Sequence, residues 1–154
     1  MLFIRNNLLE FTSYTSGKLP NQNQFISVVD DEADIVYLFR DVLSTMKGVR
    51  VFAFTDPLLA LEHFQTNHRN YKCVITDFRM PSMNGVQFLD KVKEVNPEVK
   101  RIMISAFEID DDLFKDSNSI DKFLPKPVTM SELIDEVQEY VEKWKSQQNL
   151  CVRT

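Results

Sequence analysis

Short apolar runs recur along the chain from residue 25 onward, and polar or turn-forming residues separate them. Five runs are rich in β-branched and aromatic residues, and they cover residues 25–29, 49–54, 73–76, 101–105 and 122–124. Runs of this length and composition are typical of β-strands. Val28-Val29 and Cys73-Val74-Ile75 also lack the polar alternation of a half-exposed strand, which predicts strands that are buried on both faces.

The segments between these runs carry apolar residues at the three- and four-residue spacing of an amphipathic helix. Four such stripes begin at Ile35, Leu58, Val86 and Met130. Two of them have clear start signals, because Asp56-Pro57 places a capping side chain before a proline and Thr129 with Glu132 forms a capping box. Residues 107–120 predict only a weak helix, since four of them are Asp and their apolar spacing is poor.

Strands that alternate with helices indicate repeated βαβ units, which build a parallel sheet covered on both faces. We predict a five-stranded, doubly wound α/β sheet of the flavodoxin-like (βα)5 kind, with strand order 2-1-3-4-5. This domain is expected to cover residues 25–146. Residues 1–24 are rich in Asn, Gln, Ser and Thr without a sustained period and are predicted to be a flexible arm, with residues 147–154 as a tail.

Composition and charge narrow the class of protein. The 154 residues are 44% hydrophobic, enough for the core of one domain. The net charge of −5 argues against a nucleic-acid-binding surface, which needs basic patches. No apolar stretch approaches the roughly 18 residues that span a bilayer, and two cysteines make no disulfide framework. We therefore expect a soluble, cytoplasmic protein with no membrane contact and no direct contact with nucleic acid.

Acidic side chains follow two of the predicted strands at the edge where open α/β sheets place their ligands. Asp30 and Asp31 come after the first strand, and Asp77 ends the third. These strands are neighbours in the predicted order, so the three carboxylates should converge. Carboxylates this close repel one another unless a positive charge lies among them, and a hard cation with oxygen ligands such as Mg2+ meets that need.

Two further side chains belong to the same edge of the sheet. Lys126 follows the fifth strand and brings an ammonium, while Ser105 ends the fourth and brings a hydroxyl. Taken singly, each residue has a structural explanation: dipole compensation for the acidic run, a turn for Asp77, a rigid loop for Pro-Lys-Pro and a cap for Ser105. Together, a metal, an ammonium, a hydroxyl and a carboxylate nucleophile indicate phosphoryl transfer to an aspartate.

Four stretches resemble, in order, the receiver domain of two-component response regulators. They are residues 28–32 (VVDDE), 76–85 (TDFRMPSMNG), 105–106 (SA) and 126–127 (KP). The likeness covers about residues 25–145. It implies that Asp77 accepts a phosphoryl group from a sensor histidine kinase or a phosphotransfer protein.

The resemblance also implies the roles of the neighbouring residues. Asp31, Asp77 and the backbone carbonyl of Arg79 would bind Mg2+, with Mn2+ as an alternative ion, and Asp30 would act through water. Lys126, Ser105 and Ala106 would bind the phosphoryl group. We also expect a cis peptide bond before Pro127, because the chain must turn sharply to aim the ammonium back at the acidic residues.

The same likeness suggests how the signal would leave the site. Phe123 matches the position of the family's rotating switch aromatic, and we expect it to follow Ser105 as the hydroxyl moves to the phosphoryl group. The surface that changes would be the fourth helix, fifth strand and fifth helix, where an unknown output protein or a second copy would dock. Two departures from the family concern this surface: residues 107–120 are acidic, and Phe123 lacks the hydroxyl of a tyrosine.

Two other functions compete with a phosphorylated signalling switch, which would not itself be an enzyme. A phosphatase of the haloacid-dehalogenase kind also uses Mg2+ and an aspartyl phosphate, but it needs a second Asp where this chain has Arg79. A receiver-like interaction module that is never phosphorylated remains the main alternative. His63 and His68 do not have a zinc-ligand spacing, Cys73 is expected to be a buried small hydrophobe, and Trp144 is expected to bury its indole.

Overall fold

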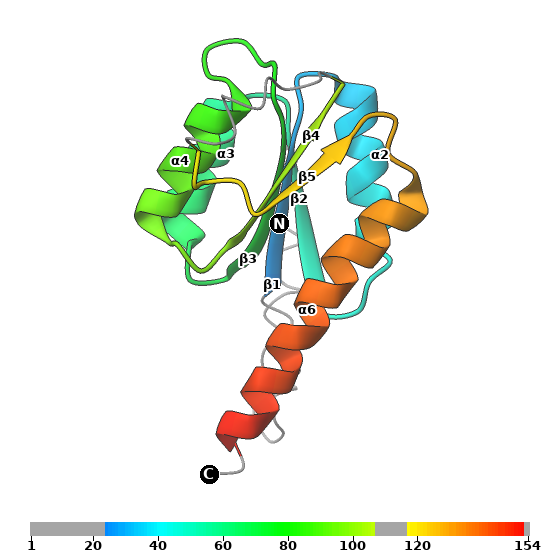
Figure 1. Cartoon of the computed structure of the whole chain (residues 1–154), viewed down its shortest axis with the longest axis vertical. Coiled ribbons are helices and arrows are strands. Elements are labelled where there is room, and N and C mark those ends of the chain that lie inside the picture. The colour runs from blue at the N-terminus through cyan, green and yellow to red at the C-terminus, as the bar shows by residue number, and fades with distance from the viewer. Residues whose placement is uncertain (1–23, 107–116, 153–154) are drawn as a thin grey trace, which may run out of the picture.

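The computed structural model describes residues 24–106 and 117–152, and its centre is a five-stranded sheet (Figure 1). All neighbouring strands are parallel, in the order β2-β1-β3-β4-β5. The strands are β1 (Gln24–Val29), β2 (Val49–Phe54), β3 (Tyr71–Asp77), β4 (Lys100–Ser105) and β5 (Lys122–Pro125). The predicted fold class and strand order are therefore confirmed.

Four helices within the described residues cover the two faces of the sheet (Figure 1). They are α2 (Ala33–Leu43), α3 (Pro57–Asn67), α4 (Gly85–Val95) and α6 (Met130–Val152). Helix α3 begins as predicted, since the Asp56 side chain accepts a hydrogen bond from the Leu58 N–H and Pro57 follows directly. Residues 1–23 of the predicted arm and residues 107–116 of the predicted weak helix lie outside the described residues, while Gln24 already belongs to β1.

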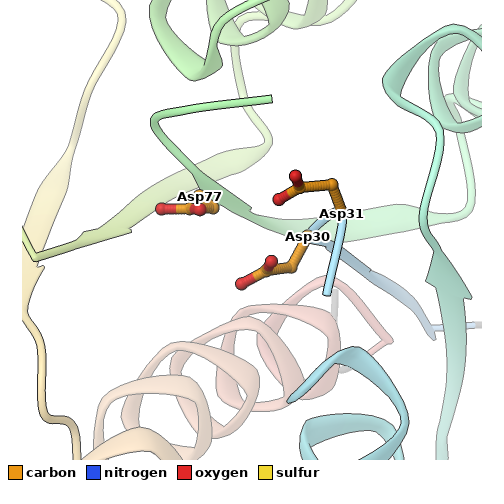
Figure 2. A group of neighbouring side chains, drawn as sticks. All are labelled: Asp30, Asp31 and Asp77. Carbon is orange, nitrogen blue, oxygen red and sulfur yellow. The ribbon is translucent and has the colours of Figure 1, made fainter. Parts of the chain in front are cut away.

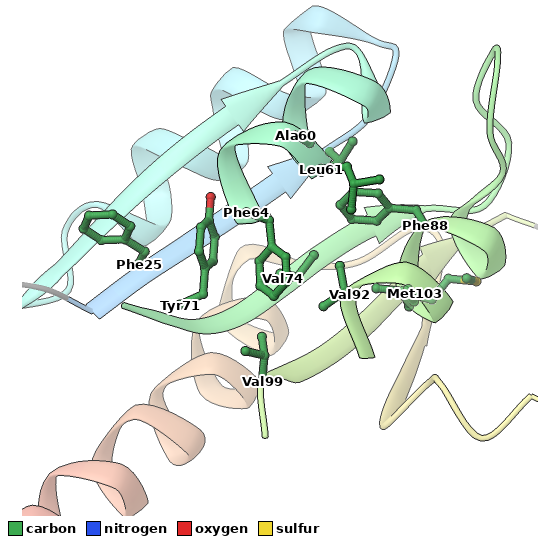
Figure 3. Packing of buried hydrophobic residues seen from close by; sticks show 12 residues of the cluster. Phe25, Ala60, Leu61, Phe64, Tyr71, Val74, Phe88, Val92, Val99 and Met103 are labelled. Carbon is green, nitrogen blue, oxygen red and sulfur yellow. The ribbon is translucent and has the colours of Figure 1, made fainter. Parts of the chain in front are cut away.

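Each face of the sheet has its own hydrophobic core because successive strand residues point to opposite sides. On one face Val74 and Met103 pack against Phe64 of α3 and Phe88 of α4 (Figure 3). On the other face the alternate residues of β3, Cys73 and Ile75, belong to the core of α2 and α6. Burial of each large side chain contributes roughly 1.5–3 kcal/mol to folding, so both cores hold the strand ends of the sheet in place.

Helix α6 is longer than the sequence pattern predicts. It runs to Val152, past the predicted domain end at residue 146, and its last turns project beyond the sheet (Figure 1). Its first turns bury Leu133, Val137 and Val141 against the sheet. Among the described residues, no helix is both long enough and apolar enough to cross a membrane.

Candidate functional site

Three aspartates meet at the carboxyl ends of the two central strands (Figure 2). Asp30 and Asp31 directly follow β1, and Asp77 is the last residue of the adjacent strand β3. One carboxylate oxygen from each lies within 4.8 Å of the others. Asp30 is buried, Asp77 is half-buried and Asp31 is exposed, so the group is open to solvent on one side.

Backbone hydrogen bonds hold two of these carboxylates. The Glu32 N–H donates to Asp30 Oδ1 at 2.9 Å, and the Phe78 N–H donates to Asp77 Oδ1 at 2.8 Å. The Asp30 N–H in turn donates to the Phe54 carbonyl at the end of β2, at 3.1 Å. Both side chains are therefore tied to rigid strand ends, which is what a preorganised site requires.

Lys126 places its ammonium between two of the carboxylates. Its Nζ lies 3.3 Å from Asp30 Oδ2 and 3.6 Å from Asp77 Oδ1. The Lys126 N–H donates to the Ser105 carbonyl at 2.9 Å, which ties the turn after β5 to the end of β4. The peptide bond between Lys126 and Pro127 is cis.

Burial and charge act on these groups in opposite directions. Burial raises the pKa of Asp77, and the Asp30 carboxylate adds to this against the opposing Lys126 ammonium. Burial also lowers the pKa of Lys126, but the carboxylates of Asp30 and Asp77 outweigh it, so that the pKa is raised overall. The site thus holds more negative charge than its one ammonium compensates, which favours the arrival of a further cation.

The remaining predicted site residues lie around this group. Ser105 is buried at the end of β4 and the exposed Ala106 follows it, while Arg79 is exposed two residues after Asp77. Phe123 lies opposite Met103 in the β4–β5 pairing and packs half-buried against the core of α3 and α4. Ser105 and Lys126 thus lie at the same end of the sheet as the aspartates, whereas Phe123 lies two residues before the end of β5.

Gly85 has a role that the sequence analysis did not assign. A Cβ atom at this position would collide with the backbone carbonyl oxygen of Asp77, and the Gly85 N–H donates to the Phe78 carbonyl at 2.8 Å. Helix α4 can therefore begin against the turn that carries Asp77 only if this residue has no side chain. The signal in the sequence was a glycine directly after the capping Asn84, at the start of a predicted helix.

Three carboxylates with oxygen donors, half-open to solvent, fit a hard divalent cation such as Mg2+. In a comparison with protein families, the family model of the response regulator receiver domain matches residues 26–138. The chain belongs to this family. Receiver domains are the phosphorylation-dependent signalling part of two-component response regulators.

Curated relatives of this receiver domain are mostly much longer proteins. It is 33% identical over 119 residues to the hydrogenase transcriptional regulatory protein HoxA of Cupriavidus necator, a match that covers 76% of this chain and 24% of that one. The sporulation initiation phosphotransferase F of Bacillus subtilis is 27% identical over 122 residues, which cover 77% of this chain and 94% of the relative. The chain thus spans only 24% and 17% of the length of two of the relatives that it matches.

Solved structures show the same fold. A response regulator receiver domain protein from Clostridium thermocellum superimposes with a TM-score of 0.71 at 25% identity, over 80% of this chain and 98% of that one. An uncharacterized protein from Neptuniibacter caesariensis superimposes with a TM-score of 0.69 at 30% identity, over 78% and 88% of the two chains. The receiver fold thus extends across most of the residues described here.

Proposed function

We propose that this receiver domain accepts a phosphoryl group on Asp77 from the phosphohistidine of a sensor histidine kinase or phosphotransfer protein. The observation that carries the proposal is the convergence of Asp30, Asp31 and Asp77 with the Lys126 ammonium 3.6 Å from Asp77. An isolated acidic turn would not need an ammonium delivered from a strand two places away in the sheet. The arrangement suits the transfer of a charged group better than a structural role.

The chain's own residues can carry the transfer by positioning and charge. An Asp77 carboxylate oxygen attacks phosphorus, a P–O bond forms, and the P–N bond to the donor imidazole breaks with its electron pair returning to nitrogen. The Phe78 N–H fixes Asp77 Oδ1 during this step. Lys126 neutralises the charge on the phosphoryl oxygens, and Ser105 and Ala106 lie at the neighbouring strand end to bind them.

A divalent cation would complete the site. We propose that Asp31, Asp77 and the backbone carbonyl of Arg79 hold Mg2+, or Mn2+ in its place, with Asp30 acting through water. When bound, the ion would supply positive charge to the phosphoryl oxygens. This assignment is consistent with the exposure of Asp31 and the half-burial of Asp77, which leave a path for a hydrated ion.

The output is proposed to be a protein contact on the side of the sheet where β5 and α6 meet. Phe123 of β5 is the large side chain on the edge strand next to Ser105 and packs half-buried, so a small rotation would change the exposed surface. An output protein or a second copy of the chain would recognise that surface. Signalling of this kind uses no substrate beyond the phosphodonor.

Labelling with a small phosphodonor tests the assignment. The full chain is incubated with Mg2+ and acetyl phosphate or phosphoramidate, and its intact mass is measured. We expect the addition of one phosphoryl group that hydroxylamine removes, and no addition in Asp77→Asn. Asp90→Asn is the matched control because Asp90 is exposed on α4. Labelling of Asp77→Asn, or no labelling of the wild type, would favour the alternative of an interaction module that is not phosphorylated.

A further inference from the structure

A half-open cavity lies at the opposite end of the sheet from Asp77. Its volume is about 560 Å3, and the start of β3, the turn before β4 and α6 line it. Tyr71 lines the cavity and is the first residue of β3, whereas Asp77 is the last. Six strand residues span about 20 Å, so this cavity is separate from the proposed phosphorylation site.

Aromatic rings from α6 form one wall of this cavity. Tyr140 and Trp144 lie one helical turn apart and line it together, and both are half-buried. The Tyr140 hydroxyl donates to the backbone carbonyl of Glu98 at 2.7 Å, which fixes its ring. Trp144 was expected to bury its indole, but the structure leaves it at the cavity because α6 projects beyond the sheet.

Two cations, Arg69 before β3 and Lys72 within it, line the same hollow. The Lys72 ammonium lies 4.4 Å from the centre of the Trp144 ring, and its hydrogen bond to the Arg69 carbonyl is long at 3.4 Å. An ammonium has three donors, so among the described residues this bond leaves donors for a ligand. Within residues 24–106 and 117–152, no salt bridge compensates Lys72 or Arg69.

Burial disfavours the charged form of Lys72. Burial lowers the pKa of the Lys72 ammonium, and the Glu98 carboxylate on the cavity rim offsets this lowering only in part. An anion bound beside Lys72 would supply the missing negative charge. The cavity volume also falls in the range of small-molecule sites, which combine apolar walls with a few placed polar groups.

We infer that this cavity binds a small aromatic oxyanion, such as an aryl carboxylate or an aryl phosphate. The oxyanion would lie between Arg69 and Lys72, where a guanidinium and an ammonium can both donate to it. The aryl group would pack against Tyr140 and Trp144. The inference does not depend on phosphorylation of Asp77. The aromatic wall comes from Tyr140 and Trp144, which lie within the part of α6 that the sequence pattern predicts.

The chain offers a specific reporter, because Trp144 is its only tryptophan. Wild-type protein in EDTA is titrated with benzoate or phenyl phosphate while tryptophan fluorescence is recorded. We expect a saturable change with both probes, and no saturable change with benzyl alcohol, which lacks the charge. Inorganic phosphate should bind more weakly than phenyl phosphate because it lacks the ring. Saturation by benzyl alcohol, or equal affinity for the two phosphates, would overturn the inference.

Charge variants test the two cations and the rim carboxylate separately. Lys72→Gln and Arg69→Gln should each bind phenyl phosphate about tenfold more weakly, which is the effect of one lost charge-assisted hydrogen bond. Glu98→Gln should bind phenyl phosphate more tightly than wild type because it removes a negative charge from the rim. Lys145→Gln is the matched control, since Lys145 lies on α6 but lines a different hollow.

Calorimetry with the same variants removes the dependence on fluorescence, because Lys72 contacts the reporter ring itself. Affinities within twofold of wild type in both Lys72→Gln and Arg69→Gln, with the thermal unfolding of each variant unchanged, would show that the cations do not form the site. Unchanged affinities in Lys72→Gln and Arg69→Gln together with weaker binding in Lys145→Gln would place the ligand outside this cavity.

Discussion

The ammonium of Lys126 lies among the aspartates and reduces the repulsion between their carboxylates. A divalent cation bound there would have the same effect. The ammonium lies 3.3 Å from Asp30 and 3.6 Å from Asp77, so it competes electrostatically with a divalent ion in the same group. After the proposed transfer, however, the same ammonium would balance a phosphoryl group of about −1.5 to −2 charge. In this proposal, one side chain opposes metal binding and supports phosphorylation.

Replacing Lys126 should separate these two effects. We expect Lys126→Met to bind Mg2+ about fivefold more tightly, because removing the ammonium from among the carboxylates would relieve repulsion of a divalent ion on the order of 1 kcal/mol. The yield of phosphorylated protein should fall at the same time. Calorimetry with Mg2+ and intact-mass measurement check the two halves, and Lys91→Met, an exposed α4 variant, is the control. Weaker Mg2+ binding in Lys126→Met would contradict this account.

His63 lies among aromatic side chains. Its Nδ1 lies 2.7 Å from the Tyr71 hydroxyl, and its ring centre is 4.4 Å from that of Phe52 and 5.5 Å from that of Phe54. Burial lowers the pKa of His63 below its usual 6.5. The folded state therefore disfavours the imidazolium, so His63 contributes full stability above about pH 6.5 and less as the pH falls below it.

The lowered pKa of His63 predicts that replacing His63 and replacing His68 will change the pH dependence of stability differently. The unfolding temperature of wild type should fall between about pH 7.5 and pH 5.5, and His63→Gln should show a smaller fall because it removes the titrating ring. His68→Gln, which leaves the contact with Tyr71 in place, should behave as wild type. Scanning calorimetry at several pH values measures all three, and parallel curves for wild type and His63→Gln would refute the assignment.

At the scale of elements, β4 and the segment before β5 are joined by a buried guanidinium. Arg101 is 4% exposed and donates to the carbonyls of Ser119 and Pro97, at 2.8 and 2.9 Å, and to Asp121 Oδ1 at 3.1 Å. The backbone N–H of Arg101 also donates to Asp121 Oδ2 at 2.8 Å. These bonds position the start of β5, and hence the turn that carries Lys126.

Removing the Asp121 carboxylate should destabilise the fold more than removing the Asp90 carboxylate, because Asp121 pairs with the buried Arg101 guanidinium. We expect Asp121→Ala to lower the free energy of unfolding by about 1–3 kcal/mol, because it leaves buried donors of Arg101 without a partner. Asp121→Asn keeps a hydrogen-bond acceptor and should lower the free energy of unfolding less. Asp90→Ala, at an exposed position of α4, should lower it little. Urea unfolding measures the series. Equal stability of Asp121→Ala and Asp90→Ala would show that this contact is not structural.

The strand order could be predicted because the chain alternates strand and helix signals, and the site followed from the residues at the strand ends. Arg101 and Asp121 could not be found in this way, since their pairing joins positions 20 residues apart with no shared period. The projection of α6 was missed for a related reason. Its apolar stripe weakens after Trp144, so the pattern indicated an end where the helix continues to Val152.

At the scale of the whole molecule, signalling requires that the phosphorylated end of the sheet affect a surface that a partner can read. The route proposed here runs from Asp77 to Ser105 on β4 and then to Phe123 on β5, the edge strand. Ser105 is the buried last residue of β4, next to the strand that ends in Asp77. In this proposal, Phe123 carries the signal onward.

The starting position of Phe123 limits how strongly it can drive the switch. It is already half-buried and packs against the core of α3 and α4. A rotation would therefore gain only part of the roughly 1.5–3 kcal/mol for burial of such a side chain. In this proposal, a gain of about 1 kcal/mol would shift a two-state equilibrium about fivefold, so that some of the unphosphorylated protein would already be in the active state.

Phe123→Ala tests this coupling without altering the carboxylates or Lys126. We expect Mg2+ binding and phosphorylation of Asp77 to stay within about twofold of wild type, while the phosphorylation-dependent change on β5 and α6 is lost. Amide exchange or chemical shifts with and without beryllofluoride, a phosphoryl mimic, measure that change in both proteins. Leu59→Ala is the matched control, because Leu59 is a large side chain exposed on α3, away from the proposed route.

If the wild-type response to beryllofluoride stays within the residues next to Asp77 and never reaches β5 or α6, Phe123 does not carry the signal. A response in Phe123→Ala as large as that of wild type would exclude this route equally.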